Sequence, residues 1–253
     1  MAKKASKAVE PVEAEPSGFR GIGQHALSFL QALRDNNDRT WFAANKSIFD
    51  EQLDAPFREL IRDLGARLAA IGSEIAVNPK APVYRIYRDV RFSKNKAPYK
   101  VHLGAGLHRG GDKARPGLLY VHIQPAASFV AAGFYVPEAP HLKAIRQAIA
   151  DDPSTFLKIA QALQSRGIQF GEADPLTRMP KGFEDQAESP AAEYLRYRSL
   201  IVARPILDDD LERHDLAATL VEFARLAAPF LEFIWKGTEA KSKAKEGKSK
   251  AKR

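Results

Sequence analysis

The fold is decided by residues 101–124, which read VHLGAGLHRGGDKARPGLLYVHIQ. At both ends of this stretch, apolar residues alternate with polar or small ones, which is the period-two pattern of a strand with one buried face. The central loop, 109–117, is rich in Gly, Asp and Pro, the residues that favour turns. We therefore predict two antiparallel strands, 101–108 and 118–125, paired so that residue 108 lies opposite residue 118.

The period-two pattern continues on both sides of this pair, and helical spacing of apolar residues replaces it toward the termini. Further strands are expected at 84–89, 129–136, 168–170 and 198–204, the last of which should end before Pro205. Helices are expected at about 24–35, after Asp38, from Asp54 to Ile71, at 138–151, after Pro153, after Pro190 and from Asp208 onward. The sequence therefore predicts an α+β fold, with a mostly antiparallel sheet and helices packed at its N- and C-terminal sides.

Polar side chains at the ends of the expected helices predict their boundaries. Asn36 and Asn37 should end the first helix, because Asn tolerates the left-handed conformation of a C-cap. Asp38 and Asp54 should each cap the helix that follows.

The distribution of charge predicts three parts of the chain. There are 39 Lys and Arg against 31 Asp and Glu, and the net charge of +8 first suggests a nucleic-acid binder. However, residues 21–235 are nearly neutral, and most of the excess lies in the Lys-rich end. We expect a disordered linker at 1–20, a single α+β domain at 21–236 and a disordered basic tail at 237–253, which either keeps the chain in solution or attracts anionic surfaces weakly.

Several classes of protein are excluded or disfavoured by composition. The chain has no Cys, which excludes disulfides, thiolate metal sites and a Cys nucleophile. No apolar stretch follows the N-terminal lysines, which argues against a secretory signal. The longest segment without a charged residue, 116–137, has Pro125 at its middle and is better interpreted as two strands than as a membrane span. We expect a cytoplasmic protein that does not enter a membrane.

One segment, residues 84–100, is unusually basic for a nearly neutral domain. It reads YRIYRDVRFSKNKAPYK, with Tyr84, Tyr87, Phe92 and Tyr99 spaced among the charges. Holding like charges together costs about 1 kcal/mol per close pair in water. An anion bound in a hollow would offset that cost, since Arg and Lys both bind phosphate. The candidate ligand-binding residues are Arg85, Arg88, Arg91, Lys94, Lys96, Tyr99 and Lys100.

Three functions are consistent with this segment. The first is an anion-binding module for a phosphorylated small molecule or a nucleic-acid backbone. The second is an enzyme acting on a phosphate- or carboxylate-bearing substrate, with Asp89 as the candidate catalytic base or as a ligand of Mg²⁺. The third is a structural protein that docks an acidic partner. No cofactor is evident, and Mg²⁺ enters only with the enzyme alternative.

Four further residues are candidates for the same site. In the predicted register, Gly104 faces His122 and Gly106 faces Tyr120, so His102 and His122 could line a polar pocket beside Lys100. A metal site would need a third ligand, and the sequence shows none. Arg39 and Lys181, which lie in turns, could supply additional positive charge.

Four motifs resemble those of one protein family and occur in the same order along the chain. They are Asn36-Asn-Asp-Arg-Thr-Trp-Phe42, Arg88-Asp-Val-Arg-Phe-Ser-Lys-Asn-Lys-Ala-Pro-Tyr-Lys100, Gly133 with Pro137, and Pro180-Lys-Gly-Phe183. Together they are similar to the bacterial and fungal family called domain of unknown function 2461, over about residues 24–235. The resemblance implies one compact α+β domain and implies no particular activity.

Overall fold

The protein forms one antiparallel sheet that is covered by helices on one side. The computed structural model describes residues 18–80, 82–171 and 175–250, the last eleven of these through their backbone alone. The strands are β1 (Ile75–Ala76), β2 (Leu103–Arg109), β3 (Leu118–Ile123), β4 (Ser128–Phe134), β5 (Gln169–Phe170) and β6 (Leu200–Ile206). Their order is β1-β2-β3-β4-β6-β5, and every neighbouring pair is antiparallel. The predicted α+β class is confirmed.

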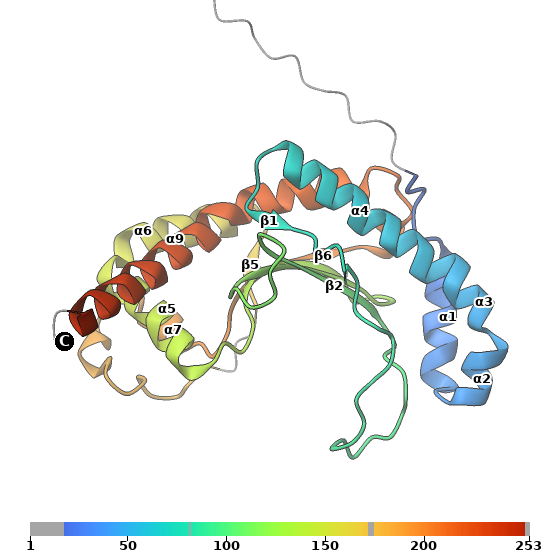
Figure 1. The fold of residues 1–253 in the computed structure, drawn as a ribbon, viewed down its shortest axis with the longest axis horizontal. Helices are drawn as coiled ribbons and strands as arrows, with labels where there is room; N and C mark the ends of the chain where they lie inside the picture. The colour runs from blue at the N-terminus through green and yellow to red at the C-terminus, as the bar shows by residue number, and fades with distance from the viewer. Residues whose placement is uncertain (1–17, 81, 172–174, 251–253) are drawn as a thin grey trace, which may run out of the picture.

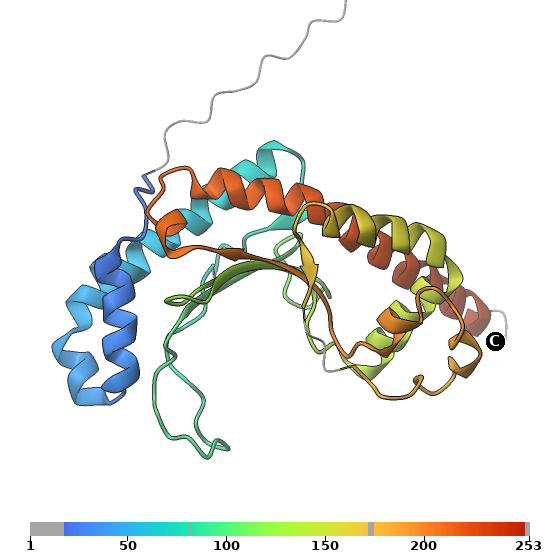
Figure 2. The same ribbon diagram turned by 180° about the vertical axis from the view of Figure 1, so that it is seen from behind.

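The pairing of β2 with β3 has the predicted register. Gly104 lies opposite His122, Gly106 opposite Tyr120 and His108 opposite Leu118. The alternate residues of β3, such as Val121, are fully buried on the other face. Helices α4 (Ala55–Ala70) and α9 (Leu216–Lys250) pack together across that convex face (Figure 1). No described helix crosses the concave face (Figure 2). Because residues alternate along a strand, Gly104 and Gly106 lie on this face, opposite to the buried side of Val121.

The N-terminal helices follow one another closely along the chain beside the sheet. They are α1 (Gln24–Asp35), α2 (Arg39–Ala44), α3 (Lys46–Phe49), the π-helical turn η1 (Asp50–Asp54) and α4. Asp38 caps α2 as predicted, because its carboxylate accepts from the backbone N–H groups of Thr40 and Trp41 at 2.8 and 2.9 Å. Asp54 is not a cap. It has a helical backbone and pairs with Arg58, because the π turn of η1 runs directly into α4 and leaves no cap position between them.

The C-terminal half differs from the predicted pattern in two places. Its helices are α5 (Ala139–Asp151), α6 (Pro153–Gln164), η2 (Glu184–Gln186), α7 (Ala192–Arg196), α8 (Asp208–Leu211) and α9. Asp208, Asp209 and Asp210 lie in the separate short helix α8 (Asp208–Leu211), and α9 begins only at Leu216. Pro205 lies inside β6, because β5 pairs only as far as Ala203 and the strand is an edge beyond it.

The structure also differs from the expected domain boundaries at both ends of the described chain. Phe19 is 2% exposed and belongs to the core, so the buried chain begins before residue 21. The expected linker otherwise falls on residues 1–17, which lie outside the described residues. Helix α9 continues to Lys250 through most of the segment expected to be disordered. Ala, Lys and Glu have high helix propensity, and extending an anchored helix avoids a new nucleation step. No helix in the described parts of the chain combines the length and apolar character needed to cross a bilayer.

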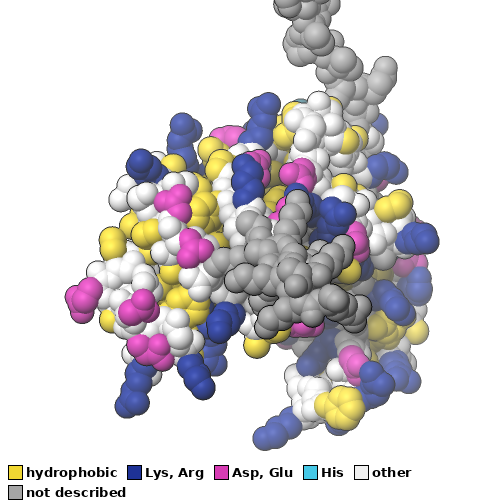
Figure 3. Space-filling model, turned by 60° about the vertical axis from the view of Figure 1, so that its left-hand side comes forward, with side chains coloured by type: hydrophobic (Ala, Val, Ile, Leu, Met, Phe, Trp, Pro, Cys, Tyr) yellow, Lys and Arg dark blue, Asp and Glu magenta, His cyan; other side chains and the backbone are white. Residues whose placement is uncertain are grey.

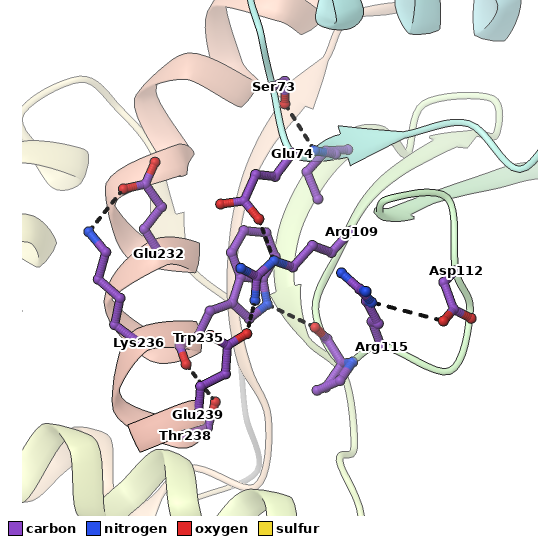
Figure 4. A network of polar contacts seen from close by, with 12 residues as sticks. Ser73, Glu74, Arg109, Asp112, Arg115, Glu232, Trp235, Lys236, Thr238 and Glu239 are labelled. Atoms are coloured by element: carbon purple, nitrogen blue, oxygen red, sulfur yellow. Dashed lines mark hydrogen bonds and ion pairs between the residues drawn. The ribbon is translucent and has the colours of Figure 1, made fainter. Parts of the chain in front are cut away.

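Arg109 and Trp235 join the end of β2 to α9 (Figure 4). The guanidinium of Arg109 lies 4.7 Å from the centre of the Trp235 ring and donates to Glu74 at 2.5 Å and to Glu239. The indole Nε1 of Trp235 donates to the carbonyl of Pro116 at 2.9 Å. These contacts fix the β2–β3 loop against the C-terminal helix.

We expect Trp235→Phe to lower the free energy of unfolding by about 1 to 2 kcal/mol, because the Pro116 carbonyl loses its donor. Urea unfolding measures this change. The matched control is Trp41→Phe, since the indole N–H of Trp41 has no hydrogen-bond partner among the described residues. Equal losses in the two variants would show that the hydrogen bond contributes nothing.

Candidate functional site

Residues 85–100 form an arm that projects from the sheet (Figure 1). The predicted strand at 84–89 is therefore wrong. Its extended backbone does not join the sheet but pairs with the returning side of the arm, through a bridge between Tyr87 and Tyr99 and a bond from the Arg88 N–H to the Pro98 carbonyl at 2.8 Å. The N–H of Tyr84 bonds to the Gly104 carbonyl at 2.8 Å and attaches the base of the arm to β2.

Asn37 and Phe42 hold the base of the arm against the N-terminal helices. The Asn37 side chain accepts from the Tyr99 N–H at 3.0 Å and donates to the Tyr99 carbonyl at 3.1 Å. The rings of Phe42 and Tyr99 stack with centroids 4.1 Å apart. Asn37 thus has a role that capping does not describe, while the Asn36 side chain closes α1 on the Ala32 carbonyl with no left-handed backbone. Tyr99 is 5% exposed, and its ring and backbone anchor the arm to the N-terminal helices.

Most cations of the arm do not converge on a hollow. Arg88 donates to the Ala97 carbonyl at 3.1 Å, and Lys96 donates to the Val90 carbonyl at 3.0 Å. These two side chains therefore stabilise the arm itself. Lys94 is exposed and does not line the basic cleft that is described below. At the free end of the arm, Lys and Arg surround an exposed hydrophobic side chain (Figure 3).

Asp89 is held by its neighbour Arg91 in a bidentate pair at 3.0 and 2.7 Å. The hydrogen bonds from Arg91 hold the pKa of the Asp89 carboxyl below its usual value. The Asp89 side chain is 60% exposed and does not line the basic cleft described below. Its geometry therefore gives the enzyme alternative no support, since a general base needs a concave site beside the cations.

A basic cleft of about 560 Å³ lies at the base of the arm, between α4 and the β2–β3 loop. It is lined by Arg58, Lys80, Pro82, Val83, Tyr84, Arg85, Tyr87, Lys100 and Lys113. Five of these residues are cationic and none is acidic. Of the predicted site residues, only Arg85 and Lys100 line this cleft. Arg58, Lys80 and Lys113 were missed, because each comes from a different segment and none stands in a charged run.

Two lysines of the cleft lie over the ring of Tyr84. The Lys100 and Lys113 ammonium groups are 5.8 and 5.5 Å from the ring centroid, within the range of cation–π attraction. Lys100 also donates to the Arg85 carbonyl at 2.8 Å. Burial lowers the pKa of Lys100 from its ordinary value. Its charge is therefore poorly solvated, which favours an anionic partner.

Beside the cleft, five rings cover part of the concave face of the sheet; we call them the ring platform, and they are Tyr84, His102, Tyr120, His122 and Phe129. The His122 ring lies 4.4 Å from that of His102 and 4.7 Å from that of Phe129. The Tyr120 hydroxyl shares a 2.9 Å hydrogen bond with His122 Nδ1. The structure thus places the rings of His102 and His122 side by side, although neither residue lines the cleft that contains Lys100.

The glycines of β2 make room for two of these rings. A Cβ at Gly104 would lie 2.7 Å from the Tyr120 hydroxyl, and one at Gly106 would lie 2.3 Å from the Tyr84 hydroxyl. Each ring therefore contacts the glycine backbone closely. Cross-strand pairing alone suggested that the Tyr120 ring would fill the space over Gly106. Instead the hydroxyl end of Tyr84, a residue outside the sheet, lies over Gly106, and that of Tyr120 lies over Gly104.

The imidazoles on the concave face favour their neutral forms. Burial, and then the positive charges of His122 and Lys100, lower the pKa of His102 to about 4. Burial also lowers the pKa of His122 and of His108. His108 is 8% exposed, and neither of its ring nitrogens has a hydrogen-bond partner among the described residues. Within the same residues, no cluster of three or more potential ligands could hold a metal ion.

The remaining predicted residues lie outside the cleft. Arg39 is exposed beside Tyr99, where its charge opposes the upward effect of burial on the pKa of that hydroxyl. Lys181 is exposed in a turn completed by Gly182, whose φ is +86°. Neither residue lines the basic cleft.

Comparison with known proteins gives one match. The family model described as "Conserved hypothetical protein (DUF2461)" matches residues 25–233. No curated protein and no solved structure matches the chain. The match spans the N-terminal helices, the arm, the cleft and the ring platform.

We expect Asn37→Ala to loosen the arm, because it removes both side-chain bonds to Tyr99. Hydrogen exchange should become faster at the amides of Arg88 and Lys100, and stability should fall by about 1 to 3 kcal/mol. The control is Asn36→Ala, which removes a bond only within α1. Unchanged exchange in the arm of Asn37→Ala would contradict this anchoring role.

The depressed pKa of His102 makes a prediction about pH. Between pH 6.5 and about 4, His102 binds a proton in the unfolded chain but not in the folded chain. The free energy of unfolding should therefore fall as the pH is lowered through this window. His102→Gln should reduce the slope of the unfolding free energy against pH. Urea unfolding at several pH values measures it, with the exposed His141→Gln as control. An identical slope in His102→Gln and the unsubstituted protein would refute the assignment.

Proposed function

The chain belongs to the DUF2461 family, and from the geometry of its cleft we propose that it is an anion-binding module for a phosphate-bearing ligand. The observation that carries the proposal is the lining of the basic cleft, which contains five cationic residues and no acidic one. Of the five, Arg58 also pairs with Asp54, which lies outside the lining. The proposal keeps the cytoplasmic location expected from the sequence, where phosphorylated ligands are abundant.

Charge repulsion gives the physical reason for a ligand. Each close pair of like charges costs about 1 kcal/mol in water, and more where the local dielectric constant is lower. Lys100 and Lys113 share the ring of Tyr84, and neither has an acidic partner among the described residues. Phosphate oxygens would neutralise these charges and accept hydrogen bonds, and Arg58 and Arg85 can bind two oxygens at once.

The free end of the arm favours a second candidate function, the docking of an acidic partner. Phe92 is 95% exposed, and the guanidinium of Arg91 lies 5.9 Å from its ring. A large exposed aromatic side chain among cations is typical of an interaction surface. This candidate uses other residues than the basic cleft, so the two functions can be tested separately.

Calorimetric titration with inorganic tripolyphosphate at low and moderate salt tests the anion-binding proposal. We expect binding that weakens as salt rises, and about tenfold weaker binding in Lys100→Gln and in Lys113→Gln, because each loses one charge-assisted contact. The control is Lys236→Gln, an exposed lysine on α9 that pairs with Glu232. The proposal fails if tripolyphosphate does not bind at low salt, or if both cleft variants bind it as tightly as the control.

A further inference from the structure

We propose that the phosphate-bearing ligand of the basic cleft also carries a nucleobase, which packs against the ring platform on the concave face of the sheet. This inference rests on the proposed function and adds the chemical class of the ligand. The shared chemistry is a planar base joined through a sugar to phosphate, and its source is either a free nucleotide or a single-stranded nucleic acid.

Tyr84 connects the cleft to the platform. Its ring lines the basic cleft, and its centroid lies 6.2 Å from that of Tyr120, with the two planes 27° apart. Tyr120 is in turn 5.8 Å from both His122 and Phe129. Lys100 lies at the same junction, because its ammonium is over Tyr84 and its charge acts on His102. A ligand with phosphate in the cleft therefore has rings within reach of its other end.

The platform remains accessible on the folded protein. Tyr84 is 36% exposed, and the other four rings are half-buried. The helices that pack on the sheet cover its convex side, and the flanking helices lie beyond the ends of the concave side (Figure 2). Exposed aromatic rings on a sheet are used by proteins that bind single strands, because every base has a face that can stack on them.

Unpaired imidazole nitrogens add a polar component to this surface. His102 forms no hydrogen bond among the described residues, although its neighbour His122 is bonded at both ring nitrogens. His108 is more than nine-tenths buried with both nitrogens unpaired. A Cβ built at Gly106 would be 2.3 Å from the Tyr84 hydroxyl and 3.3 Å from His108 Nε2, so these two groups converge at the junction. The edge of a base carries both donors and acceptors, which the half-buried His102 can bind at the surface, whereas the nitrogens of His108 lie beneath it.

The test compares ATP with inorganic tripolyphosphate, which carries the same number of phosphates and no base, in the presence of a chelator. We expect ATP to bind about tenfold more tightly, which corresponds to one stacked base. Phe129→Leu and Tyr120→Leu should each remove most of this difference while leaving tripolyphosphate affinity unchanged. The control is Tyr135→Leu, an aromatic residue that is 73% exposed and lies outside the platform.

A second arm of the titration uses a single-stranded oligothymidylate and identifies the source of the base. Tighter binding of the oligonucleotide than of ATP, lost in Phe129→Leu, supports a single-stranded nucleic acid. Tighter binding of ATP, lost in the same variant, supports a free nucleotide. Equal affinities for ATP and tripolyphosphate, with no effect of Phe129→Leu, overturn the nucleobase inference and leave the anion-binding proposal standing. If none of the three probes binds, both proposals fail.

Discussion

The register between β2 and β3 is the constraint on which the rest of the structure depends. With Gly104 opposite His122, the large apolar residues of both strands face the helices, and the glycines and rings face the other way. A shift of one residue would exchange the two faces and expose the apolar residues. The same register leaves space over Gly104 and Gly106 for the hydroxyl ends of Tyr120 and Tyr84. Core packing and the concave surface therefore follow from one pairing.

The arm and the cleft depend on a second constraint, which joins parts of the chain that are far apart in sequence. Asn37 replaces a strand partner by offering one donor and one acceptor to the backbone of Tyr99, and Phe42 stacks on its ring. Because the base of the arm is fixed in this way, Arg85 and Lys100 meet cations from α4 and from the β2–β3 loop. At the free end of the arm, Phe92 is 95% exposed, and Arg91 and Lys96 have their hydrogen-bond partners within the arm itself.

The sequence predicted features that depend on neighbouring residues. The alternation around loop 109–117 predicted the β2–β3 register, and Asp38 was a correct cap because its partners are two and three residues away. The strand at 84–89 was wrong because a period of two describes any extended segment, whatever its partner. The sequence could not show that most cations of the arm point away from a common site. Arg88 and Lys96 donate to backbone carbonyl oxygens, and any residue can supply such a partner, so the residue types do not reveal it. Lys80 and Lys113 join the cleft only through the tertiary fold.

A crystal structure of the protein with bound ATP tests the central claim most directly. We expect the phosphates to lie between Lys100 and Lys113, and the adenine to contact the rings of His122 and Phe129 on the concave face. Phosphates bound instead at Arg91, Lys94 and Lys96 on the free end of the arm, with no ligand in the basic cleft, would contradict the account.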